Sequence, residues 1–148
     1  MDALNQLLAF EEIRAVKAQY CRMLDTKNWA GFAALFTDDA VMDVREDTGN
    51  PPITGVTAII EQVRFAVDFA ATSHQVHTPE ITLEGSEHAA CIWAMQDRVV
   101  WQFGKSPIPG VASITGYGQY HELYRRVNGV WKIASLRLSR FHVDMHPE

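Results

Sequence analysis

Residues 13–40 read IRAVKAQYCRMLDTKNWAGFAALFTDDA and begin with apolar residues at helical spacing. This spacing predicts a helix with one face toward a core. The predicted face is formed by Ile13, Val16, Tyr20 and Leu24. Asp25 follows where that helix should end. Because buried polar groups cost free energy unless they are paired, Tyr20 and Asp25 indicate either internal hydrogen bonds or a polar pocket.

The rest of the first half carries further helical patterns. A second helix is predicted over residues 29–36 and a third over residues 54–70, where apolar residues recur at three- and four-residue intervals. Between them, residues 40–44 indicate a short strand, and residues 47–52, with the sequence DTGNPP, indicate an irregular loop.

After Ala71 the pattern changes to that of long β-strands. The predicted strands are residues 74–83, 89–103, 111–127 and 130–143. Asn128-Gly129, between the last two, is a strong hairpin signal because both residue types tolerate positive φ. Helices followed by an antiparallel sheet indicate a single α+β domain over residues 1–148. Long strands covered by three helices should bend into a half-open cone with an apolar pocket between the layers.

Composition restricts the class of protein. The chain of 148 residues is long enough to bury a core without a disulfide or a metal. Its net charge of -5, with scattered basic residues, argues against a nucleic-acid partner. No stretch approaches the roughly 20 apolar residues of a membrane span, and the N-terminus resembles no export signal. Cys21 and Cys91 lie alone in apolar surroundings, so we expect reduced thiols in a cytoplasmic protein.

Three segments carry a resemblance to a known family. They are YCRMLDTKNWAGFAALFTDDAVMD (residues 20–43), SHQVHTPEITLEG (residues 73–85) and YHELYRRVNGVWKIASLRLSR (residues 120–140). In order and spacing the chain resembles the SnoaL-like branch of the NTF2-like superfamily. Members of that branch include polyketide cyclases, scytalone dehydratase, a bile-acid dehydratase, a hexachlorocyclohexane dehydrochlorinase and the small β subunits of ring-hydroxylating dioxygenases. The resemblance implies an NTF2-like cone, with N-terminal helices on a strongly curved antiparallel or mixed sheet.

The resemblance also singles out four residues: His74, Asp25, Tyr20 and Arg137. In the eliminating members the histidine abstracts a proton, the aspartate orients its ring, and the tyrosine or arginine handles the oxygen that gains or loses charge. The residue chemistry agrees with these roles. Imidazole titrates near neutral pH and suits a general base, whereas a phenol can donate a hydrogen bond without ionising. A guanidinium would anchor a carboxylate or stabilise an enolate.

Each candidate has a purely structural alternative. Asp25 could cap the second helix, and Tyr20 could be a core tyrosine bonded to a backbone carbonyl. His74 could be a strand histidine whose ring is hydrogen-bonded only for structural reasons, and Arg137 could be an exposed strand residue. On the last strand Arg137 alternates in phase with apolar Trp131 and Ile133, so we expect it to face inward, and we prefer it to Arg140 in the opposite set.

We expect no metal and no cofactor. His74 and His77 are three residues apart on a strand and should face opposite sides of the sheet, so they cannot readily hold one ion. No phosphate-binding or covalent nucleophile motif is present. The expected partner is a small hydrophobic molecule. Its plausible pocket walls are Phe36, Met42, Phe65, Phe69, Trp93, Met95, Trp101 and Tyr117.

The apolar runs at residues 89–95 and 99–103 predict strands buried on both faces, and hence a homo-oligomer, a trimer or a dimer, packed through the sheet. The leading functional hypothesis is a cofactor-independent lyase or isomerase, most simply a dehydratase acting on a hydrophobic carbonyl compound. One alternative is a cyclase that forms a carbon-carbon bond after the same deprotonation. The other is a non-catalytic ligand-binding protein or a dioxygenase β-like subunit. The combination of Tyr20, Asp25 and His74 argues against the subunit.

Overall fold

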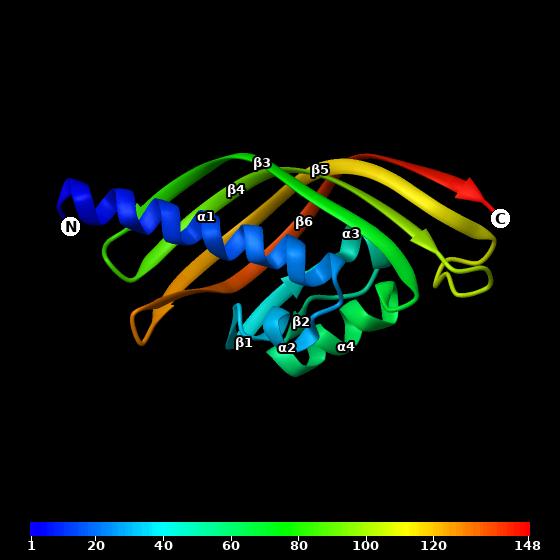
Figure 1. Cartoon of the computed structure of the whole chain (residues 1–148), viewed down its shortest axis with the longest axis horizontal. Helices are drawn as coiled ribbons and strands as arrows, with labels where there is room; N and C mark the ends of the chain where they lie inside the picture. The colour runs from blue at the N-terminus through cyan, green and yellow to red at the C-terminus, as the bar shows by residue number, and fades with distance from the viewer.

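The computed structural model describes residues 1–148 and shows helices packed on one side of a curved sheet (Figure 1). The helices are α1 (Ala3–Asp25), α2 (Trp29–Ala33), α3 (Arg45–Thr48) and α4 (Val56–Val67). The strands are β1 (Phe36–Asp43), β2 (Ile53–Thr54), β3 (Ala70–Glu84), β4 (His88–Trp101), β5 (Val111–Val127) and β6 (Val130–Pro147). In this view the long helix α1 crosses in front of the long strands, and α2 and α4 lie with β1 and β2 in the lower part of the picture.

The six strands form one mixed sheet in the order β2-β1-β6-β5-β4-β3. Neighbours are antiparallel except for β1 and β6, which are parallel. The predicted α+β cone is therefore confirmed. Local predictions were wrong at three places. Strand β1 begins at Phe36, which was assigned to the second helix, and Arg45–Thr48 forms one helical turn that overlaps the first residues of the predicted loop. The third helix is shorter than predicted, since Thr54 and Ala70 belong to β2 and β3.

Local sequence explains where the main elements begin and end. The side chain of Asp2 caps α1 by accepting a hydrogen bond from the amide of Asn5 at 2.8 Å. Beyond the last turn, Lys27 has a φ of 60°, which stops the helix and turns the chain toward α2. At the β5–β6 hairpin, Asn128 and Gly129 have φ values of 51° and 79°, as the hairpin signal predicted.

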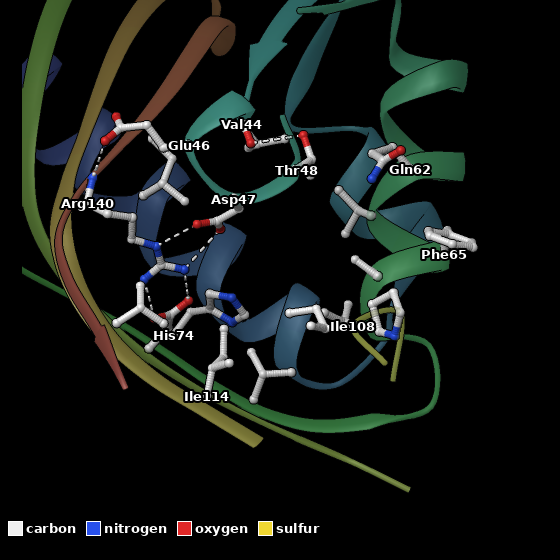
Figure 2. A pocket seen from close by; sticks show the side chains of 18 of the residues that line it. Val44, Glu46, Asp47, Thr48, Gln62, Phe65, His74, Ile108, Ile114 and Arg140 are labelled. Carbon is white, nitrogen blue, oxygen red and sulfur yellow. Dashed lines mark hydrogen bonds and ion pairs between the residues drawn. The ribbon is translucent and has the colours of Figure 1, made fainter. Parts of the chain in front are cut away.

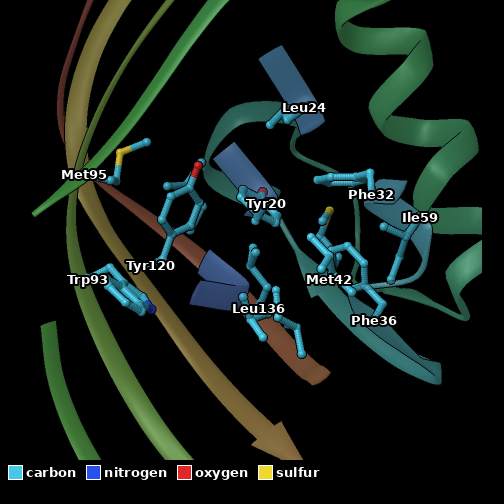
Figure 3. Close-up of a cluster of buried hydrophobic side chains, with 14 of the residues drawn as sticks. Tyr20, Leu24, Phe32, Phe36, Met42, Ile59, Trp93, Met95, Tyr120 and Leu136 are labelled. Atoms are coloured by element: carbon cyan, nitrogen blue, oxygen red, sulfur yellow. The ribbon is translucent and has the colours of Figure 1, made fainter. Parts of the chain in front are cut away.

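An aromatic cluster joins the helices to the sheet (Figure 3). Tyr20 packs against Phe32 at 5.0 Å between ring centroids and edge-on against Tyr120 of β5 at 5.8 Å. Phe36, at the start of β1, lies 5.2 Å from Phe32. Each buried aromatic side chain contributes about 1.5–3 kcal/mol through burial, so this cluster fixes the C-terminal half of α1 on the sheet.

A charged pair that was not predicted from the sequence lies inside this core. The Nζ atom of Lys17 donates to Glu122 of β5 at 2.8 Å, and neither side chain has any exposed surface. Tyr124 donates its hydroxyl to the other oxygen of Glu122 at 2.9 Å. The ammonium also lies 3.6 Å and 3.7 Å from the ring centroids of Tyr20 and Tyr120. Carboxylate hydrogen bonds and two aromatic faces thus replace the water that both charges lose.

A β-bulge in β6 changes which side chains face the core. Ile133 pairs with Tyr124 of β5. The adjacent residue Leu123 pairs with Ser135, so Ala134 is an extra residue on β6. An extra residue reverses the alternation of all side chains that follow it.

The expectation that Arg137 faces inward is therefore wrong. Before the bulge the buried residues include Ile133, but after it they are Leu136 and Leu138, in the phase of Arg140. Arg137 is exposed and lies on the outer face of the sheet, where it pairs in register with His121. The inward and outward alternation of side chains that begins at Trp131 is valid only up to the bulge at Ala134.

Burial on β4 follows a regular alternation, with one face in the core and the other partly exposed. A single chain therefore does not bury both faces of β4, and the homo-oligomer stays a prediction.

Cys21 and Cys91 are free thiols, and burial raises their pKa values to about 11 and about 12. None of the helices has both the length and the apolar character needed to cross a bilayer.

Replacing Lys17 by Met should lower the free energy of unfolding by about 3–5 kcal/mol, because Glu122 would be left buried without its partner. The double variant Lys17→Met with Glu122→Leu should recover much of this loss, since no charge is then buried. Urea unfolding followed by circular dichroism gives both values. As a control, Glu12→Gln removes the exposed contact to Arg126 and should change the stability little. A single variant as stable as the wild type would contradict this account.

Candidate active site

A cavity of about 710 Å³ lies between the sheet, the C-terminal end of α1, α4 and the loop after β4 (Figure 2). Its walls are mainly apolar and include Leu24, Val63, Val99, Ile108 and Leu138. Polar groups gather at the inner end, where His74, Arg140 and Asp47 lie together. An apolar cavity with a few convergent polar groups is the usual form of a small-molecule site.

The structure brings His74 and Asp25 together, although 49 positions separate them. Nδ1 of His74 lies 2.7 Å from Oδ1 of Asp25, and the amide of His74 donates to Oδ2 at 2.9 Å. Thr72, two residues earlier on β3, donates its hydroxyl to Oδ1 at 2.8 Å. Lys27 in turn donates to that hydroxyl oxygen at 3.0 Å. Asp25 is thus bound by three groups from β3 and has little freedom to turn.

These contacts set the charge of Asp25. Partial burial raises its pKa, but the hydrogen bonds from the ring and amide of His74, the charge of a protonated His74 and the hydroxyl of Thr72 outweigh burial, and the pKa lies below its ordinary value. An ionised carboxylate only accepts hydrogen bonds, so Nδ1 of His74 carries the proton. No protein group bonds Nε2, and His74 lines the cavity with a side chain only 9% exposed. Nε2 is therefore an unprotonated ring nitrogen that faces no protein donor and can accept a proton.

Two buried tyrosine side chains also line the cavity. Tyr20 was expected from the sequence, whereas Tyr120 of β5 was missed, although it alternates with Glu122 and Tyr124 on one face. Burial raises the pKa of both phenols well above the ordinary value, and the charge of Glu122 adds to this. Both therefore stay protonated at neutral pH and can donate hydrogen bonds to an oxygen atom.

The cation of the site is Arg140, in the place that was expected for Arg137. Its guanidinium donates to Asp97 of β4 at 2.6 and 2.8 Å and to Asp47 of α3 at 2.9 and 3.1 Å. The side chain is 8% exposed, and these carboxylates raise its pKa further, against the effect of burial. Asp97 was missed, although an acidic residue within the apolar run of β4 indicates a buried partner.

Gly116 makes room for this arrangement. Arg140 on β6 must reach across β5 to Asp97 on β4, and Gly116 pairs with Asp97 in the register of β4 and β5. A Cβ atom added at Gly116 would lie 2.9 Å from Nη1 of Arg140 and 3.0 Å from a backbone oxygen. The absent side chain is thus a requirement of the ion pair.

The expected pocket walls divide into three groups. Met42, Phe65 and Trp101 line the cavity. Phe36, Trp93 and Met95 are buried in the core, and Phe69 and Tyr117 are exposed away from the cavity. His77 is exposed, unlike His74.

Comparison with known proteins agrees with this fold. The family model of the SnoaL-like domain matches residues 5–137. The sequence is 26% identical to Probable cyclase FGR4 of Gibberella zeae over 138 residues, which are 88% of this chain and 89% of that protein. A solved structure of a scytalone dehydratase-like protein from Novosphingobium aromaticivorans superposes with a TM-score of 0.83 at 20% identity, over 99% of this chain and 93% of that one.

Another solved structure, hexachlorocyclohexane dehydrochlorinase LinA-type3 from Novosphingobium barchaimii, gives a TM-score of 0.81 at 18% identity, over 98% of this chain and 94% of that one. At such identities the structural likeness concerns the fold. The family match spans most of the chain, from the first turns of α1 to the middle of β6. The chain therefore belongs to the SnoaL-like domain family.

Proposed function

We propose that this protein is a cofactor-independent lyase, a dehydratase, in which His74 removes a proton next to a carbonyl group of a hydrophobic substrate. The observation that carries the proposal is the hydrogen bond of 2.7 Å between Asp25 and Nδ1 of His74, beside the cavity. It leaves Nε2 as the free base, and it stabilises the imidazolium that forms when this nitrogen takes the proton.

The remaining steps use groups that line the same cavity. As Nε2 takes the proton from carbon, the electron pair of that bond moves toward the carbonyl oxygen and forms an enolate. Tyr20 and Tyr120 are protonated donors that can hydrogen-bond this oxygen or the departing hydroxyl. The enolate then re-forms the carbonyl and a carbon-carbon double bond, and the hydroxyl leaves as water with the proton that His74 returns.

A cyclase is the second candidate, favoured by the similarity to Probable cyclase FGR4 over 88% of the chain. Here the same enolate carbon would attack a second carbonyl of the substrate and close a ring. Both reactions begin with the same deprotonation, so exchange of the substrate α-hydrogen with solvent is a shared first test. A ligand-binding protein without turnover would bind the compound but not exchange this hydrogen.

His74→Gln should lower the rate of α-hydrogen exchange by about 10²–10⁴-fold, because the amide cannot act as a base. The assay incubates β-hydroxy aryl ketones in D2O and measures deuterium uptake by mass spectrometry and enone formation by absorbance. Binding of the same ketones should change little. The matched control is His77→Gln, on the exposed side of the same strand, which should keep full activity. Equal exchange in wild type and His74→Gln, or none in wild type, would contradict an enzyme of this kind.

Asp25→Asn should remove part of the acid sensitivity of the fold. The pKa of Asp25 is lower in the folded protein than in the unfolded chain, so the unfolded chain binds the proton more tightly. Its contribution to stability is therefore complete above the unfolded pKa of about 3.9 and is lost as the pH falls through the folded pKa. Unfolding free energies between about pH 2 and 6 should fall less steeply for Asp25→Asn than for wild type. Glu80→Gln, at an exposed position of β3, is the control, and identical slopes for Asp25→Asn and wild type would refute the assignment.

A further inference from the structure

The permanent cation of the cavity is already neutralised by the protein. Nε of Arg140 donates to Asp47, Nη1 donates to Asp97, and Nη2 donates to both carboxylates. Nη1 also faces the sulfur of Met95 at 3.9 Å. A ligand that is to bind the guanidinium must therefore displace one of these groups.

Among the charged residues that line the cavity, acidic residues outnumber basic ones. Arg140 faces three carboxylates among the lining residues, Glu46, Asp47 and Asp97. Glu46 accepts a hydrogen bond from the backbone amide of Arg140 at 3.2 Å, so its charge also lies at this end of the cavity. No lysine or second arginine lines the cavity. An anionic ligand would meet net negative charge, and like charges brought together in a desolvated site cost several kcal/mol.

The two partners of Arg140 differ in exposure. Asp97 has a side chain only 5% exposed and lies on β4, so it is a fixed part of the sheet. Asp47 is 32% exposed and lies on the single helical turn α3, beside His74 in the cavity (Figure 2). Asp47 therefore occupies the position on Arg140 that a substrate carboxylate would otherwise take.

We infer that the pocket accepts uncharged carbonyl compounds and rejects carboxylates, and that Asp47 is the residue that sets this preference. The inference rests on the proposed function, because it names the substrate class of the same site. Neutral donors such as Tyr20 and Tyr120 suit an uncharged carbonyl oxygen, since no further unpaired charge is brought into the cavity.

Two probes of nearly the same shape test the inference. Titration calorimetry compares 2-naphthamide, which is uncharged, with 2-naphthoate, which is an anion at pH 7. The wild-type protein should bind the amide and should bind the carboxylate at least about tenfold more weakly. Asp47→Ala should strengthen carboxylate binding by at least about tenfold and should leave amide binding within about twofold. Asp47→Asn keeps the shape of the side chain and should change carboxylate binding in the same direction.

Two further variants control the result. Asp39→Ala removes another acid that pairs with an arginine, Arg125, outside the cavity, and it should leave both affinities unchanged. Adding Arg140→Gln to Asp47→Ala should abolish the gain for the carboxylate, because no free cation remains. Wild-type binding of 2-naphthoate as tight as that of 2-naphthamide, no binding of the amide, or an unchanged ratio in both Asp47 variants would overturn the inference.

The same titrations on His74→Gln separate this inference from the proposed function. That variant lacks the base but keeps Arg140, Asp47 and Asp97, so its preference for the amide should match that of the wild type. The charge preference can hold in a protein without turnover, and turnover can be present in a pocket that admits carboxylates. Failure of one proposal is therefore visible independently of the other.

Discussion

The fold and the site depend on the buried contact between Lys17 of α1 and Glu122 of β5. Burying each of these charges costs several kcal/mol of lost hydration. The helix is therefore stable only in the position that brings the two charges into contact. Asp25 follows Lys17 by about two turns, or about 12 Å along the helix axis. This distance brings its carboxylate to Thr72 and His74 on β3. A contact with no proposed part in the chemistry thus determines where the chemistry can occur.

Much of the fold could be predicted from the sequence because the period of the apolar residues differs between helices and strands. The four long strands and the hairpin at Asn128-Gly129 follow from it. Phe36 was misassigned because it continues the helical spacing of Trp29 and Phe32, yet it pairs with Ile133 in the parallel contact of β1 with β6. That contact joins positions almost a hundred residues apart, and local periodicity contains no information about it.

The site was less predictable for the same reason. The family resemblance, rather than any local pattern, linked Asp25 with His74. Lys17 lies on the same helical face as Ile13 and Tyr20, so its burial was foreseeable, whereas its pairing with Glu122 depends on the packing of α1 on β5. The network of Arg140 depends on three strands and α3 at once. Side chains that meet through several elements are fixed by tertiary packing, which one sequence does not display.

The bulge at Ala134 has a consequence for how members of this family diverge. A residue inserted in or removed from the first half of β6 exchanges the entire inner and outer sets of side chains downstream. Without the bulge, Arg137 and Ser139 would face inward and Arg140 would face outward, with no substitution at any of these positions. In that register Arg137 would lie opposite Tyr120, where Leu138 lies now, so the inward arginine would stand at a different position along the sheet. An alignment by residue identity would not reveal such a change, because the residues are the same and only the face of the sheet that they occupy differs.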